Sequence, residues 1–140
     1  MPKKTQVLLV EDNPGDIQLT QEAFVEGRVP AELHAVNDGD TAISLLRAKT
    51  GRNRKPDLIL LDLNLPRRNG WEVLDILKKD NDLKLIPVVI LTSSSAEKDI
   101  LRAYALQANC YVVKPADFDD FVDVVRKLSH FWFSIAQLPN

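Results

Sequence analysis

Five polar residues lie where apolar runs of the sequence end, and together they could bind a metal ion and a phosphoryl group. They are Glu11, Asp12, Asp62, Thr92 and Lys114. Three clustered carboxylates repel one another, and a hard divalent cation such as Mg²⁺, which prefers oxygen ligands, relieves that repulsion. A lysine and a hydroxyl across the same pocket suit a phosphoryl group. An aspartate in such a setting can act as the nucleophile that forms an aspartyl phosphate.

Five apolar, β-branched runs at regular spacing predict the strands that would position these side chains. The first, third and fourth are almost wholly apolar, which is typical of parallel strands buried on both faces. In the second run Glu32 and His34 alternate with apolar neighbours, which predicts an edge strand. The predicted strands are Thr5–Val10, Ala31–Val36, Asp57–Leu61, Ile86–Leu91 and Cys110–Val113.

A residue able to cap a helix follows each predicted strand. Such a residue accepts a hydrogen bond from an N–H group of the first helical turn. The predicted caps are Asn13, Asp38, Asn69, Ser94 and Asp117. A strand followed by a helix, five times over, predicts an α/β fold: a doubly wound, five-stranded parallel sheet with helices on both faces. The carboxyl ends of its strands, where the polar residues stand, are where such folds gather their functional groups.

Length and composition exclude several classes of protein. The chain has 140 residues, and we expect 1–140 to form one domain with an extended C-terminal helix or tail at about 129–140. Apolar runs reach about five residues, far short of the ~20 that a membrane helix needs. The net charge of −2 gives no general attraction for nucleic acid. The one cysteine, Cys110, fits a reducing compartment, so we expect a cytoplasmic protein.

The sequence resembles the receiver domain of two-component response regulators in four motifs: LLVEDNPGD, LILLDLNLPRRNGWEVL, PVVILTSSS and YVVKPAD. The resemblance runs from about Thr5 to Leu128. It implies a flavodoxin-like sheet of order 2-1-3-4-5, bound Mg²⁺, and a histidine kinase that phosphorylates Asp62. The loop around residues 47–56, the EDNPGD start and the extended C-terminus resemble the small single-domain phytochrome-associated response regulators, which implies a phytochrome as the kinase.

The resemblance also implies a role for each site residue. Thr92 would hydrogen-bond the phosphoryl group, Lys114 would pair with it, and Tyr111 would be an aromatic switch that turns inward when Thr92 moves. The peptide bond between Lys114 and Pro115 would be cis. The protein would be a signalling phosphoacceptor that catalyses only its own phosphoryl transfer and dephosphorylation. The metal ligands would be Asp12, Asp62, the backbone carbonyl of Asn64 and, through a water, Glu11.

Other interpretations stay open at this point. Acidic residues such as Glu11 and Asp12 also stabilise helix N-termini, and a lysine such as Lys114 is often a solvated surface residue. A receiver-like scaffold would bind partners without turning over phosphate. A small hydrolase would use an aspartyl phosphate on foreign substrates, but it needs a cap domain for which the chain has little room. Neither the kinase nor the downstream target can be named from the sequence.

The predicted last helix, from Asp117 to about Gln137, carries more apolar surface than one layer of the sheet requires. One stripe should face the sheet: Phe118, Val122, Val125 and Trp132. A second stripe has no partner in a lone domain, and neither has Phe133, which lies elsewhere on the helix. The tail could fold back on its own domain, but we expect a symmetric homodimer. Its predicted interface is the second stripe: Val124, Phe131, Ile135 and Leu138.

Overall fold

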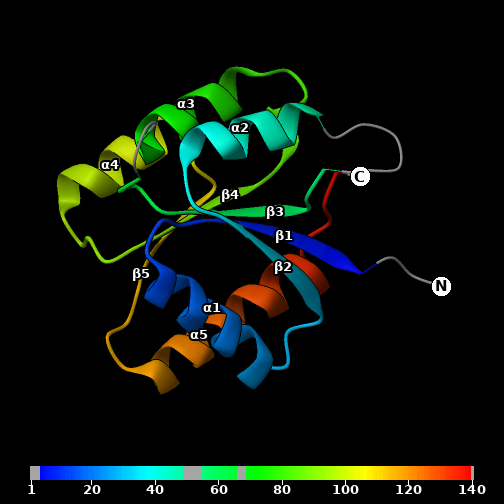
Figure 1. Cartoon of the computed structure of the whole chain (residues 1–140), viewed down its shortest axis with the longest axis vertical. Coiled ribbons are helices and arrows are strands. Elements are labelled where there is room, and N and C mark those ends of the chain that lie inside the picture. The colour runs from blue at the N-terminus through cyan, green and yellow to red at the C-terminus, as the bar shows by residue number, and fades with distance from the viewer. Residues whose placement is uncertain (1–3, 49–54, 66–68, 140) are drawn as a thin grey trace.

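A five-stranded parallel sheet forms the centre of the protein (Figure 1). The computed structural model describes residues 4–48, 55–65 and 69–139, so the predicted loop around residues 47–56 lies largely outside the described residues. The strand order is β2-β1-β3-β4-β5, which confirms the predicted sheet and its edge strand. The strands are β1 (Thr5–Val10), β2 (Ala31–Val36), β3 (Leu58–Leu61), β4 (Val88–Thr92) and β5 (Cys110–Val113).

Two strands begin later than their apolar runs predict. β3 begins at Leu58 rather than Asp57, and β4 begins at Val88 rather than Ile86. A short 3₁₀ helix, η1 (Leu83–Leu85), accounts for the second difference, since the N–H of Ile86 donates to the carbonyl of Leu83 and closes that turn. Pro87 follows and has no N–H to offer a strand ladder, so regular pairing starts one residue later.

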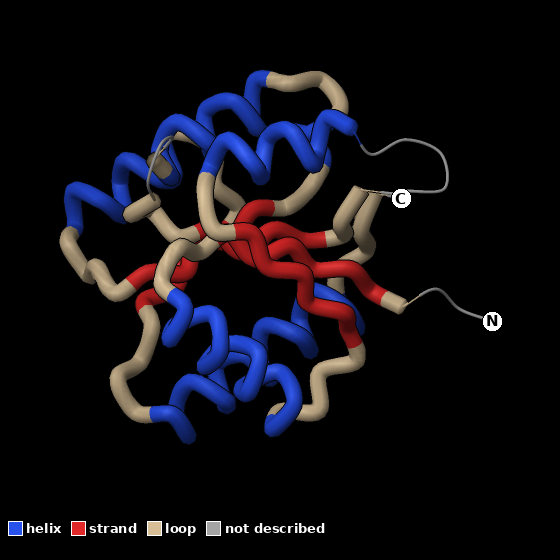
Figure 2. Tube along the Cα trace, in the orientation of Figure 1, coloured by secondary structure: helices blue, strands red, loops and turns tan. Residues whose placement is uncertain are grey.

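Helices cover both faces of the sheet. Figure 1 shows α1 and α5 together on one face and α2, α3 and α4 on the other, and the tube in Figure 2 shows the same three layers. The strand residues alternate accordingly: Val7 and Leu9 pack toward α1 and α5, whereas Leu8 and Val10 pack toward the opposite layer. The helices are α1 (Pro14–Glu26), α2 (Gly39–Ala48), α3 (Gly70–Lys79), α4 (Glu97–Ala105) and α5 (Phe118–His130).

Four of the five predicted helix caps are confirmed. In each, the side-chain oxygen accepts a hydrogen bond from the N–H three residues further on: Asn13, Asp38, Asn69 and Asp117. The fifth, Ser94, is wrong, because α4 starts later and has Ala96 at its cap position. The Ser94 hydroxyl instead donates to the Asp99 carboxylate at 2.6 Å.

The C-terminal segment continues past α5 as a π-helical turn, η2 (Phe131–Ile135). The predicted sheet-facing stripe is confirmed, with Val122 and Val125 buried and both Phe118 and Trp132 packed against the same core. Phe133 also packs there, contrary to the prediction that it lacks a partner. A π turn holds more residues than the 3.6 of an α-helix, so it changes which side chains face inward.

The second predicted stripe is only partly covered by the chain itself. Phe131 is 49% exposed and Ile135 57% exposed, whereas Val124 and Leu138 are half-buried. In the part of the chain that the structure describes, no helix has the length and apolar character needed to cross a membrane.

Candidate functional site

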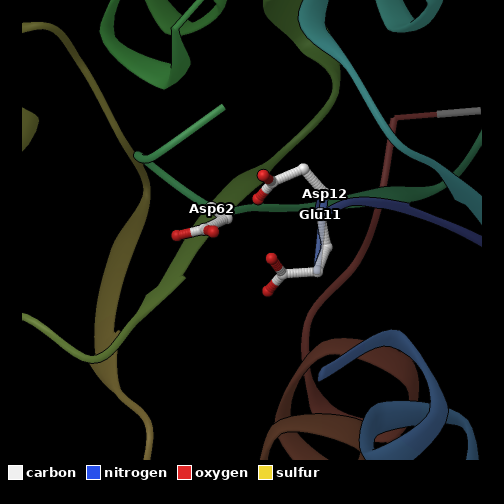
Figure 3. Close-up of side chains that lie close together, drawn as sticks. All are labelled: Glu11, Asp12 and Asp62. Atoms are coloured by element: carbon white, nitrogen blue, oxygen red, sulfur yellow. The ribbon is translucent and has the colours of Figure 1, made fainter. Parts of the chain in front are cut away.

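Three carboxylates meet where β1 and β3 end. Glu11, Asp12 and Asp62 each place a carboxylate oxygen within 4.8 Å of the others (Figure 3). The register of β1 and β3 brings them together. Val10 pairs with Leu61, and an acidic residue follows each of them in the chain. Glu11 and Asp62 are buried and Asp12 is exposed, so the cluster opens to solvent on one side. The prediction that these side chains converge is therefore correct.

The electrostatics of the cluster oppose full ionisation. Burial raises the pKa of Asp62, and the hydrogen bond and charge of Glu11 raise it further. Two groups lower the pKa of Asp62: the charge of Lys114, and the N–H of Asn64, which donates to Asp62 Oδ1 at 3.5 Å. The resulting pKa is about 7. A hard cation would remove this penalty, and an all-oxygen donor set suits Mg²⁺, so the residues present fit that metal.

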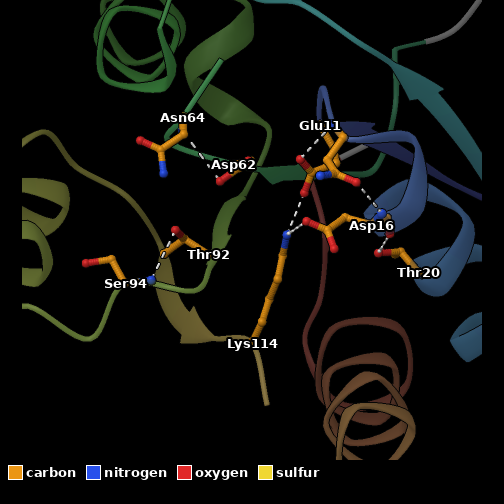
Figure 4. A network of polar contacts seen from close by, with 9 residues as sticks. Glu11, Asp16, Thr20, Asp62, Asn64, Thr92, Ser94 and Lys114 are labelled. Atoms are coloured by element: carbon orange, nitrogen blue, oxygen red, sulfur yellow. Dashed lines mark hydrogen bonds and ion pairs between the residues drawn. The ribbon is translucent and has the colours of Figure 1, made fainter. Parts of the chain in front are cut away.

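Lys114 reaches into the cluster from the end of β5. Its ammonium donates to Glu11 Oε1 at 2.5 Å and lies 3.6 Å from Asp16 Oδ2 (Figure 4). Burial alone would lower the pKa of the Lys114 amine. The hydrogen bond and charge of Glu11, with the charges of Asp62 and Asp16, outweigh burial and raise this pKa above its ordinary value. Lys114 is therefore a charged group aimed at the carboxylates, as the sequence predicts, and not a solvated surface lysine.

Asp16 at this site was not predicted from the sequence. Its position in the first turn of α1 indicates only a helix-start role, and its N–H donates to the side chain of Asn13. Its carboxylate, however, faces Lys114 (Figure 4). The sequence does hold a sign of this role, because only three residues separate the end of β1 from the start of α1 in the EDNPGD segment. A helix that begins so soon after the strand must keep its first turn near the strand end, where the site lies.

Thr92 closes the site at the end of β4. It is buried, and its hydroxyl accepts a hydrogen bond from the N–H of Ser94 at 3.4 Å. The carbonyl of Thr92 also accepts the N–H of Lys114 at 2.7 Å. This backbone hydrogen bond joins the ends of β4 and β5, which carry the hydroxyl and the ammonium. Both residues lie at the end of the sheet where the carboxylates meet (Figure 4).

Tyr111, the predicted switch residue, is tied to the loop that follows Thr92. Its hydroxyl donates to the carbonyl of Ser94 at 2.9 Å, and its N–H donates to the hydroxyl of Tyr104 on α4 at 3.1 Å. The prediction of a cis Lys114–Pro115 bond is wrong, because this bond is trans. The preference of X–Pro bonds for trans is only about 0.5–1 kcal/mol, so either isomer is accessible to such a sequence.

Gly70 supports the site by close approach, and sequence reasoning missed it. A Cβ at this position would lie 2.4 Å from the carbonyl oxygen of Asp62 and 2.5 Å from the Cα of Leu63. The N–H of Gly70 donates to the carbonyl of Leu63 at 3.0 Å. The first residue of α3 therefore packs directly on the backbone that carries Asp62, and only glycine leaves room for this.

Comparison with known proteins agrees with this fold. The family model for the response regulator receiver domain matches residues 7–126, and the chain belongs to that family. It is 40% identical over 135 residues to the response regulator Rcp1 of Synechocystis sp., covering 95% of this chain and 92% of Rcp1.

Solved structures give the same result. The phosphorylated cyanobacterial phytochrome response regulator RcpA superposes with a TM-score of 0.89 at 45% identity, covering 99% of this chain and all of that one. The Mn²⁺-bound form of Rcp1 gives 0.85 at 40% identity, covering 97% and 99%. The protein is a receiver-domain response regulator of a two-component system, related to these phytochrome response regulators.

Proposed function

We propose that this protein is a switch controlled by a phosphoryl group, which Asp62 accepts from a histidine kinase. The observation that carries the proposal is the convergence of a buried aspartate, two further carboxylates and a lysine whose side chain is only 12% exposed, at one end of the sheet. The relatives named as phytochrome response regulators support a phytochrome as that kinase. We further propose that residues 1–140 act as one receiver unit, without direct binding to nucleic acid, in the reducing cytoplasm that the free thiol of Cys110 fits.

Each residue of the site has a part in the transfer. A carboxylate oxygen of Asp62 forms a bond to phosphorus as the bond between phosphorus and the donor's nitrogen breaks. The Lys114 ammonium and the Thr92 hydroxyl then contact the oxygens of the phosphoryl group. Asp12, Asp62, the carbonyl of Asn64 and, through a water, Glu11 would hold Mg²⁺, which when bound neutralises charge on the carboxylates and the phosphoryl oxygens. Hydrolysis of the aspartyl phosphate uses the same residues, so the protein acts on itself.

The response to phosphorylation would pass through Thr92. Movement of this hydroxyl toward a phosphoryl group withdraws it from the N–H of Ser94, the residue whose carbonyl holds the Tyr111 hydroxyl. Such a change shifts the balance between two arrangements of the loop before α4 and of β5. The downstream partner would read this difference on the surface formed by α4, β5 and α5.

We also propose a homodimer through the C-terminal segment. Exposed Phe131 and Ile135 support it, and so does a groove of about 530 Å³ that lies between β5 and α5. The groove is mostly apolar, and Val124, Phe131 and Trp132 line part of it. A second copy would bring the same surface, which a two-fold axis makes complementary to itself.

Intact mass spectrometry after incubation with phosphoramidate and Mg²⁺ tests the main proposal. The wild type should gain the mass of one phosphoryl group, and EDTA should prevent the gain. Asp62→Asn, which keeps the shape of the side chain but removes the nucleophile, should gain none. A wild type that gains no mass would support the alternative of a receiver-like scaffold without phosphoryl turnover. An Asp62→Asn variant that gains mass at the wild-type rate would place the acceptor elsewhere.

A further inference from the structure

Asp16 presents its carboxylate to Lys114 from outside the metal-ligand cluster. The Asp16 Oδ2 to Lys114 Nζ distance is 3.6 Å, and the cluster of three carboxylates does not include Asp16. Its structural contacts use backbone atoms only: its N–H donates to Asn13 at 3.0 Å, and its carbonyl accepts the Thr20 hydroxyl at 2.8 Å. The charge on the side chain can therefore be removed while both of these hydrogen bonds at the start of α1 are kept.

The Lys114 ammonium already has two acidic partners. In this structure its ammonium is shared between Glu11 and Asp16, whereas the proposed function needs it on the phosphoryl group of Asp62. A divalent cation would engage the charge of Glu11. Asp16 would then remain as the carboxylate that still attracts the ammonium, and its negative charge would also face the incoming anionic donor.

We propose that Asp16 is a positioning residue that competes with the phosphoryl group for Lys114 and so slows phosphoryl uptake at Asp62. The inference rests on the proposed function. In this view the ion pair between the first turn of α1 and the end of β5 restrains the resting state, and uptake requires Lys114 to leave Asp16. The partial exposure of the Asp16 side chain limits the strength of this restraint but does not remove it.

The rate of uptake from phosphoramidate at saturating Mg²⁺ tests the proposal. In this reaction the P–N bond breaks, a carboxylate oxygen of Asp62 binds phosphorus, and ammonia leaves. Asp16→Asn should be faster than wild type by about two- to five-fold, the factor that a partly exposed ion pair is worth. Asp16→Glu, which keeps the charge, should stay near the wild-type rate. Asp119→Asn, the matched loss of an acid from the first turn of α5, should leave the rate unchanged.

A double-mutant cycle separates competition for the lysine from a general charge effect. In a Lys114→Ala background, Asp16→Asn should give no acceleration. An equal acceleration with and without the lysine would overturn the inference, and so would an unchanged rate for Asp16→Asn in the wild-type background. If Lys114→Ala takes up no phosphoryl group, Asp16→Glu decides: a rate as high as that of Asp16→Asn overturns the inference. A wild type that takes up no phosphoryl group overturns the proposed function together with it.

Discussion

The hydroxyl of Tyr111 donates a hydrogen bond to the backbone carbonyl of Ser94 across 2.9 Å, which joins β5 to the loop after β4. The same Ser94 offers its N–H to the Thr92 hydroxyl at 3.4 Å. One short segment therefore links Thr92, the residue expected to sense the phosphoryl group, with β5 at one edge of the sheet. This connection gives the proposed switch a route through three residues: Thr92, Ser94 and Tyr111.

Removing the Tyr111 hydroxyl should weaken that route. Tyr111→Phe keeps the ring and loses the bond to Ser94, so Asp62 should still be phosphorylated while the loop before α4 responds less. Hydrogen exchange of residues 93–105, with and without phosphoramidate, measures the response. A change on phosphorylation as large as that of wild type would remove the tyrosine hydroxyl from the switch.

The raised pKa of Asp62 predicts that the metal-free protein becomes less stable to unfolding as the pH rises. The pKa is about 7 in the folded chain, against 3.8 for an ordinary aspartate. Between these values the unfolded chain has lost the proton and the folded chain retains it, so stability falls as pH rises through this window and then levels off. Asp62→Asn lacks this cost and should be more stable than wild type by about 1 kcal/mol or more at pH 7.5.

Urea unfolding in EDTA at pH 4 and pH 7.5 checks the predicted direction of this change in stability. The gain in the free energy of unfolding from Asp62→Asn should be larger at pH 7.5, and Mg²⁺ should reduce it by stabilising the wild type alone. A gain that is equal at both pH values would contradict the role of burial and of Glu11 at this carboxylate.

Gly70→Ala should disturb the backbone of the acceptor residue. The added Cβ would meet the Asp62 carbonyl and Leu63 at distances that require the backbone to move. We expect a loss of about 1–3 kcal/mol in the free energy of unfolding, as for other overpacked sites. Gly15→Ala is the control, because its Cβ would meet only the Asn13 side chain, at 3.1 Å. Equal effects of the two substitutions on thermal unfolding would argue against this close approach.

The C-terminal segment should hold the homodimer. Phe131→Ser, Ile135→Ser and Leu138→Ser together should give a monomer that still phosphorylates. Burial of such side chains is worth about 1.5–3 kcal/mol each, against association costs of ~4–15 kcal/mol. Val25→Ser removes an even more exposed apolar residue from α1 and should leave the dimer intact. Sedimentation over a concentration series decides, and a monomeric wild type would mean that the tail serves only its own domain.

Sequence patterns predicted the parts of this molecule that depend on local chemistry and strand order. Apolar runs predicted all five strands, and polar residues at their ends predicted the meeting of Glu11, Asp62 and Lys114. The failures involve packing and hydrogen bonds that spacing along the chain does not reveal. Ser94 fits a capping pattern, but its hydroxyl donates to Asp99 and α4 starts later.

Gly70 shows a second limit of sequence reasoning. Its importance comes from the packing of α3 on the backbone of Asp62 and Leu63, just after β3, which spacing along the chain does not reveal. Phe133 shows a third, since a π turn after α5 replaces the 3.6-residue period on which its predicted exposure rested.

The central claim is that Asp62 carries the phosphoryl group, and borohydride reduction tests it most directly. Protein phosphorylated with Mg²⁺ present is treated with borohydride, which converts an aspartyl phosphate to homoserine, and is then digested and sequenced by tandem mass spectrometry. We predict homoserine at position 62, and none after incubation in EDTA. Homoserine at position 12 or at any other aspartate, with position 62 unmodified, would contradict the assignment.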